Sequence, residues 1–270
     1  MRFFSHSLES PSLSKAATVA SAASPHADEP PPEYKLVWCD EFDYTGPPDP
    51  TKWSYEEGFI RNCESQLYVR DRRENARVED SALVIEAHKE KFAIPHRTWL
   101  RKCAKFTSAS LFSKESWQYG RIEVRAKLPH GRGVWPAIWT MGEGKWPVCG
   151  EIDLMEFVGH SPNHIHARVH FGRCLLLHRS RGRSLEVCEP WRDFHVYSVE
   201  WTAEQVSFFY DEHCYFKFDV KVADRKDGTS PFCEPHHLKI NLALGGVWGG
   251  AVDDEVLPQQ FLIDYVRVFQ

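Results

Sequence analysis

The sequence predicts an all-β fold, a sandwich or a barrel, and two observations carry that prediction. Ten short segments from Tyr34 onward are rich in β-branched and aromatic residues, and many are bounded by Gly, Pro, Asn or Asp. No segment of about twelve residues shows the apolar stripe of an amphipathic helix, so the strands follow one another without helices between them.

In chain order, the predicted strands cover residues 34–38, 82–88, 108–113, 120–128, 151–157, 166–171, 194–201, 205–211, 237–244 and 261–269. The alternation of apolar and polar residues indicates which face of the sheet each side chain lies on. From Ile122 to Leu128 apolar residues alternate with charged ones, and Ile240 shares a face with Leu242 while Asn241 lies on the other. One apolar and one polar face per strand are typical of the outer layers of a sandwich. No repeat or linker interrupts the pattern, so we expect one domain over 34–270.

Residues 1–33 are rich in Ser, Ala and Pro and show no hydrophobic periodicity. We expect this segment to be disordered or cleavable. Residues 15–24 (KAATVASAAS) are similar to the end of a signal peptide, although their apolar part lacks Leu, Ile and Phe.

The amino-acid composition excludes several classes of function. The 270 residues carry a net charge of −5, so there is no basic field to hold a nucleic acid by its phosphates. Eight isolated cysteines form no CxxC pair, which argues against a zinc ribbon or a thioredoxin-type site. No apolar run is long enough to predict a membrane span. Ten tryptophans indicate either a bulky core or platforms for the apolar faces of sugar rings.

The segment GEIDLMEF (150–157) places three carboxylates within six residues. In a regular strand, Glu151 and Asp153 share one face and Glu156 points into the core, where an unpartnered carboxylate is unfavourable. One extra residue at Leu154-Met155, a β-bulge, returns Glu156 to the face of the other two. The sequence therefore predicts a bulged strand.

The bulge has a chemical consequence. About four strand steps of ~3.3 Å separate Glu151 from Glu156, and side chains leaning together leave a gap on the order of 5 Å. Retaining glycosidases use a carboxyl separation of about 5–5.5 Å. Asp153 between them couples the titrations, and repulsion among the three raises at least one pKa. A solvated acidic face and a calcium or magnesium site remain alternatives.

The stretch WPVCGEIDLMEFVGH (146–160) resembles the catalytic strand of glycoside hydrolase family 16, in its laminarinase-like branch. Further blocks fit the family in order and extend the resemblance over 34–270. They are LVWCDEFDYTG (36–46), NCESQLY (62–68), YGRIEVRAKLPHGRGVWPAIWTMG (119–142), DFHVYSVEW (193–201), INLALGGVWGG (240–250) and IDYVRVFQ (263–270).

The resemblance implies a β-jelly-roll sandwich of two antiparallel sheets with a concave glycan-binding cleft. It implies endo-hydrolysis of β-1,3-linked glucan with retention of configuration. Glu151 falls on the nucleophile, Glu156 on the acid/base and Asp153 on the assisting carboxylate. No cofactor is needed for that chemistry. The expected partner is a β-glucan polysaccharide or oligosaccharide, and we expect an extracellular monomer.

Aromatic residues and histidines supply further candidates. With the resemblance, Trp139 and Trp146 are expected sugar platforms, and Trp135 is either a platform or core. His170 corresponds to a cleft histidine of the family. Because His164, His166 and His170 alternate along one strand face, a transition-metal site is a competing hypothesis.

The remaining candidates follow from the resemblance alone. Asn62, Glu64 and Asn241 match polar residues that line the family's cleft, and Trp248 matches a loop-borne platform. Glu41 and Asp264 are the positions to test for the structural calcium that family members often carry.

The chain departs from the family at Ala167-Arg168, where Gly-Thr is common, and over 171–191, which is unusually basic and apolar. Substrate preference is therefore less certain than reaction class. A transglycosylase, a non-catalytic glucan-recognition protein and a galactan hydrolase remain alternatives.

Overall fold

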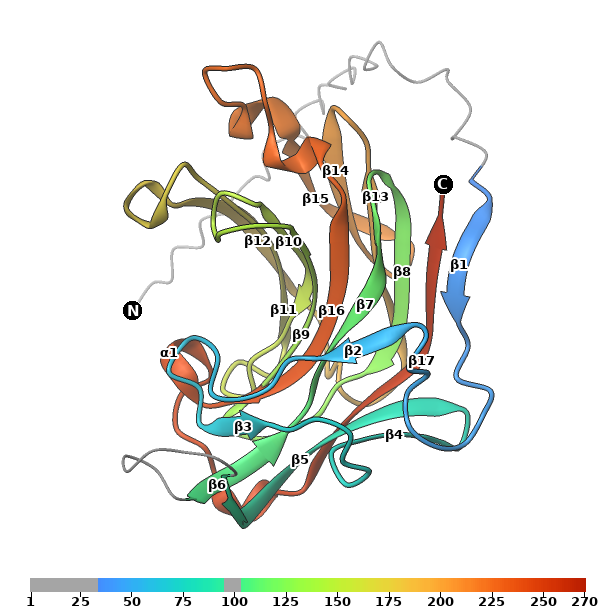
Figure 1. Cartoon of the computed structure of the whole chain (residues 1–270), viewed down its shortest axis with the longest axis vertical. Coiled ribbons are helices and arrows are strands. Elements are labelled where there is room, and N and C mark those ends of the chain that lie inside the picture. Colours follow the sequence, from blue (N-terminus) through green and yellow to red (C-terminus); the bar gives the residue numbers. More distant parts are fainter. Residues whose placement is uncertain (1–33, 95–102) are drawn as a thin grey trace, which may run out of the picture. The chain divides into compact units, whose positions relative to one another are not determined.

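The computed structural model describes residues 34–94 and 103–270 (Figure 1). The predicted disordered or cleavable segment 1–33 lies outside the described residues, and its boundary stays a prediction. The described strands are β1 (Leu36–Asp40), β2 (Trp53–Tyr55), β3 (Gln66–Tyr68), β4 (Ala76–Glu79), β5 (Ala82–Ala93), β6 (Cys103–Ser108), β7 (Ser110–Trp117), β8 (Gly120–Lys127), β9 (Val134–Gly142), β10 (Glu151–Glu156), β11 (His164–Phe171), β12 (Arg179–Glu186), β13 (His195–Trp201), β14 (Gln205–Tyr210), β15 (His213–Asp219), β16 (His236–Leu244) and β17 (Gln259–Phe269).

Helical structure in the described part is limited to single turns. These are α1 (Gly246–Gly249) and the 3₁₀ turns η1 (Leu175–Leu177), η2 (Val220–Ala223), η3 (Pro231–Cys233) and η4 (Asp254–Val256). None of the helices in the described ranges is long and apolar enough to cross a membrane. The all-β prediction is confirmed.

The strands form two sheets, so the fold is a sandwich and not a barrel. A ten-stranded sheet has the order β15-β14-β13-β8-β17-β5-β6-β3, with β1 added to β17 and β4 to β5. A seven-stranded sheet, the cleft sheet below, has the order β12-β11-β10-β9-β16-β7-β2. Neighbouring strands are antiparallel except β3 and β6, which are parallel. Figure 1 shows the strands of the cleft sheet bowed.

The alternation seen in the sequence sets the core. Strand β8 alternates strictly between buried and half-buried residues, with Ile122 and Val124 facing the interior as predicted. Strand β11 alternates in the same way. On β16 the predicted core residues Ile240 and Leu242 are fully buried. Its opposite face, which carries Asn241, lines a cavity on the outer side of the cleft sheet. The sandwich thus leaves one polar face of the cleft sheet available for a site.

The expected calcium positions do not come together as a metal site. Glu41 accepts two hydrogen bonds of 2.8 Å from Arg267, and Asp264 is paired with Arg125. A guanidinium that occupies a carboxylate in this way opposes a cation at the same oxygens. These ion pairs argue against calcium at Glu41 and Asp264, and the expectation at these positions stays a prediction.

Candidate active site

Strand β10 carries the predicted bulge. Against β9, Asp153 pairs with Trp139 and Met155 with Ile138, which leaves Leu154 as the extra residue. Leu154 and Met155 are both fully buried, whereas parity predicted only one of the two in the core. The bulge brings Glu151, Asp153 and Glu156 to one cavity of about 680 Å³. The geometry that the sequence required of this strand is confirmed.

A glycine sets the start of this strand. Gly150 has a φ of 78°, a conformation that L side chains rarely adopt. A Cβ at this position would also lie 2.8 Å from Pro231. Gly150 therefore lets the chain turn tightly into β10 and delivers Glu151 to the cavity.

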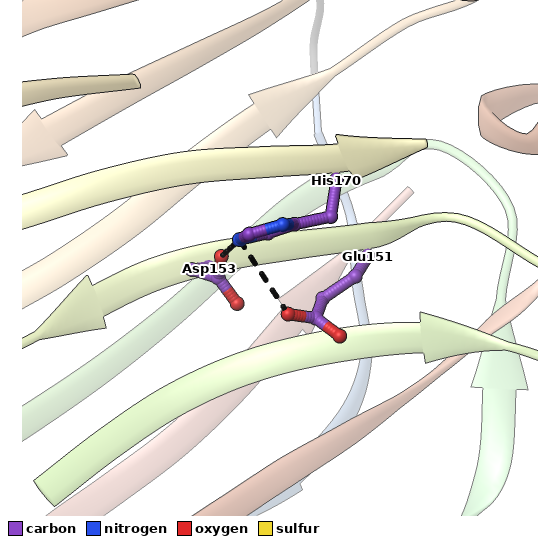
Figure 2. A group of neighbouring side chains, drawn as sticks. All are labelled: Glu151, Asp153 and His170. Carbon is purple, nitrogen blue, oxygen red and sulfur yellow. Dashed lines mark ion pairs between the residues drawn. The ribbon is translucent and has the colours of Figure 1, made fainter. Parts of the chain in front are cut away.

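His170 lies across from the carboxylates. Strand β11 pairs with β10 so that His170 stands opposite Glu151. Figure 2 shows the imidazole edge directed at two carboxyl groups: Nε2 lies 3.3 Å from Asp153 Oδ2 and 3.9 Å from Glu151 Oε1. Asp153 is 2% exposed, and its Oδ2 has no hydrogen bond of good geometry. The cluster is compact, and Asp153 is its most buried member.

Burial raises the pKa of all three carboxyl groups. Burial, reinforced by Asp153, raises the pKa of Glu151 to about 8. Burial and the charge of Glu151 raise the pKa of Glu156 to about 7, against a hydrogen bond of 3.1 Å from Trp135 Nε1. Burial raises the pKa of Asp153 well above its usual range. The protons leave in successive steps, because each ionised group raises the pKa of its neighbours.

Such a cluster can perform acid–base and nucleophilic chemistry at one point. A partly protonated set of carboxyls contains both a proton donor and an anionic nucleophile. Double displacement uses the state in which Glu151 is ionised and Glu156 protonated. In the unliganded site the two pKa values lie in the opposite order, so this state competes with the one in which the proton sits on Glu151.

The tryptophans line the cavity in different ways. Trp146 is 37% exposed and presents an open ring face. Trp139 is buried, its Nε1 donates to Asn241 Oδ1 at 2.8 Å, and the cationic groups of Arg61 and Lys239 lie 4.9 Å and 4.8 Å from its ring. Trp146 is therefore the more accessible platform for a sugar face.

Two further tryptophans lie near the Glu156 end of β10. Trp135 and Trp248 meet edge to face with ring centroids 5.5 Å apart, and both line the cavity. Trp135 is buried but delivers its N–H to Glu156. Its place beside the acid group was not apparent from sequence.

The polar candidates also line the cavity. Asn62 and Gln66 donate to the two oxygens of Glu64, at 3.2 Å and 2.8 Å. Asn241 donates to the hydroxyl of Tyr68 at 3.0 Å. These side chains are held in place before any ligand arrives.

The three-histidine metal hypothesis is not supported. His164 lies 3.1 Å from Ser161 Oγ, and His166 lies 2.7 Å from Ser184 Oγ. Within the described ranges, the one group of three potential metal ligands is Glu151, Asp153 and His170. The alternation was read correctly, but the three imidazoles do not converge.

Several cavity residues were missed by the sequence reasoning. Glu56 pairs with nearby Arg61 and with Lys239 Nζ, the latter at 2.8 Å and from a distant part of the chain. Ile60 and Met141 complete the lining. Arg168 also lines the cavity. Its departure from the small residue common in the family was the only sequence signal for any of these residues.

Comparisons with known proteins identify the family. The family model described as glycosyl hydrolases family 16 matches residues 64–267. A β-glucanase of Rhodothermus marinus is 45% identical over 255 residues, covering 88% of this chain and 86% of the relative. A glucan endo-1,3-β-glucosidase of Niallia circulans is 33% identical, and the match covers 87% of this chain but 38% of that protein.

Solved structures agree over the same region. The laminarinase of Rhodothermus marinus is 44% identical with a TM-score of 0.78, covering 88% of this chain and 98% of that one. LamA of Z. galactanivorans, in complex with laminaritriose and laminaritetraose, is 36% identical with a TM-score of 0.77, covering 87% and 98%. The expected jelly-roll sandwich is thereby confirmed. The chain belongs to glycoside hydrolase family 16.

Proposed function

We propose that this protein is a retaining endo-glycosidase that hydrolyses internal β-1,3-glucosidic bonds of laminarin-type or mixed-linkage β-glucans. The observation that carries the proposal is the bulged strand β10, which brings three buried carboxyl groups to one tryptophan-lined cavity. The match to the R. marinus laminarinase supports the substrate class, because it extends over 98% of that chain.

The reaction proceeds in two displacements. The Glu151 carboxylate attacks the anomeric carbon while Glu156 gives its proton to the leaving glycosidic oxygen. A covalent glycosyl–enzyme ester forms and the sugar on the leaving side departs. Glu156, now ionised, takes a proton from water as that water attacks the anomeric carbon, and Glu151 is released. These steps use only side chains of this chain.

The surrounding groups control proton location. The Trp135 N–H stabilises ionised Glu156 between the two steps. Asp153, buried between the glutamates, raises the pKa of Glu151 through its proximity. The exposed ring of Trp146 offers a sugar-binding face at the cavity wall.

A direct test follows reducing ends released from laminarin by the purified chain and by Glu151→Ala and Glu156→Ala variants. We expect hydrolysis by the parent chain and a loss of several orders of magnitude in both variants. Glucan binding without hydrolysis by the parent chain would instead assign a recognition protein. Proton NMR of the first product checks retention, for which the first anomer must be β.

Two alternatives have their own readouts. Products longer than an added oligosaccharide acceptor would indicate transglycosylation. Release from agar or carrageenan but not from laminarin would indicate a galactan hydrolase. Neither alternative is favoured by the relatives described above.

The proposal also covers export and the oligomeric state. We propose an extracellular monomer, since its substrate is a polymer. Secretion of the full chain from expressing cells, and the mass of the purified protein by light scattering, test these two points.

A further inference from the structure

His178 lies beside His170, outside the set of groups used above. It follows the η1 turn within 171–191, the region that departs most from the family pattern. His170 Nδ1 and His178 Nε2 are 2.8 Å apart. The two rings are nearly parallel, at 9°, with centroids 5.0 Å apart.

The nitrogen–nitrogen distance, the angle between the rings and the distance between their centroids define an edge-to-edge contact. Rings stacked face to face would have closer centroids, and their nitrogens would not meet in the ring plane. Nearly coplanar imidazoles joined nitrogen to nitrogen satisfy both the short contact and the longer centroid distance. Since imidazole N–H groups and lone pairs lie in the ring plane, this is good hydrogen-bond geometry.

The direction of this bond follows from what His170 faces on its other side. Burial lowers the pKa of both histidines, which favours the neutral ring with one N–H for each. His170 Nε2 faces Asp153 and Glu151, and in the state used for double displacement Glu151 is ionised and needs a donor. The N–H of His170 therefore sits on Nε2, its Nδ1 accepts, and His178 Nε2–H donates.

Charged and titratable groups surround both His170 and His178. Those that face His170 come from β10 and β11: Glu151, Asp153, Glu156 and Arg168. A second cavity, of about 450 Å³, is lined by His178 together with Arg173, Arg179, Asp224 and Arg225. The ring of Trp146 packs against His178 at 4.6 Å between centroids and restricts its movement.

We propose that His178 is a positioning residue that holds His170 with its Nε2–H directed at Asp153 and Glu151. This inference rests on the proposed glycosidase function. A donor directed at Glu151 favours its ionised form, the form that attacks the anomeric carbon. The divergent segment thus supplies His178 as a hydrogen-bond partner for His170, whose Nε2 faces the carboxyl groups.

The test compares His178→Ala with His178→Gln, whose amide can still donate to Nδ1, and with His164→Ala as a control on the same strand face as His170. Activity on laminarin is followed against pH. For His178→Ala we expect about a tenfold fall in kcat/KM, the equivalent of about 1.4 kcal/mol for one hydrogen bond. The fall lies mainly in kcat, and the acidic limb moves to higher pH because the pKa of Glu151 rises.

The two other variants separate positioning from packing. His178→Gln should retain most of the activity, and His164→Ala should keep the parent pH profile. An unshifted acidic limb in His178→Ala overturns the proposal, as does an equal loss at every pH that glutamine does not rescue.

A second readout does not depend on activity. Nitrogen-15 NMR of the full chain above pH 8, where Glu151 is ionised, should show His170 protonated on Nε2 and not on Nδ1, and the opposite tautomer overturns the proposal. If the parent chain hydrolyses no glucan, the proposed function fails, and this spectrum still decides the direction of the histidine bond.

Discussion

Replacing Glu151 by Gln should stabilise the fold, and more so at alkaline pH. Burial raises the pKa of Glu151 from 4.5 to about 8. A carboxyl whose folded-state pKa is raised binds its proton more tightly in the folded state. Its ionisation therefore lowers the free energy of unfolding progressively as pH rises from its unfolded pKa to its folded pKa. Glutamine keeps the shape without the charge.

The magnitude follows from the shift. At 1.36 kcal/mol per pKa unit, the change sets an upper bound on the order of 5 kcal/mol. Asp153 and Glu156 take up part of the proton exchange, so we expect a gain of roughly 1–3 kcal/mol at pH 8 and less than about 1 kcal/mol at pH 5.

Urea unfolding followed by tryptophan fluorescence at the two pH values measures this difference. Glu212→Gln is the matched control, because Glu212 is exposed and should give no pH-dependent gain. A gain for Glu151→Gln that is equal at pH 5 and pH 8, or a loss at pH 8, would refute the reasoning. The result is independent of any catalytic assignment.

Three further predictions concern the cavity. Trp135→Phe removes the 3.1 Å bond to Glu156, so the pKa of Glu156 rises and the alkaline limb of kcat/KM on laminarin should move up by about one unit. Trp146→Ala removes the exposed ring and should raise KM about tenfold with a smaller change in kcat. Glu56→Ala leaves the Arg61 and Lys239 cations without their carboxylate and should lower the free energy of unfolding by about 3 kcal/mol, measured by urea titration.

Each of these has a control or a contrary outcome. Trp248→Phe alters the ring that packs on Trp135 but removes no bond to Glu156, so its alkaline limb should stay in place. For Trp146→Ala, an unchanged KM contradicts the platform role. Glu57→Ala changes an exposed neighbouring carboxylate, and a loss as large as that of Glu56→Ala would contradict the special role of the buried ion cluster.

Much of the site was predictable because local periodicity reports which way side chains point. In GEIDLMEF, parity alone required an extra residue near Leu154, and the pairing of β10 with β9 contains it. The resemblance to a family then supplied residues that the described structure places along one cavity, including Asn62 and Trp248. Neither step required knowledge of long-range contacts.

Other features needed the folded chain. The partner of Glu41 could not be read from sequence, because Arg267, which donates to that carboxylate, lies more than two hundred residues away. The histidines of β11 alternate as predicted, yet neighbouring strands decide their partners.

The sequence by itself determined the all-β class, the faces of regular strands such as residues 120–128, and the bulge that gathers three carboxylates, because these depend on residues a few positions apart. The tertiary structure decided which distant groups meet. Lys239 reaches Glu56 across 183 positions, and Trp135 reaches Glu156 because β9 lies beside β10. His178 meets His170 only because the chain turns back into β12. Strand order and register bring these residues into contact, and no local pattern of residues encodes the contacts.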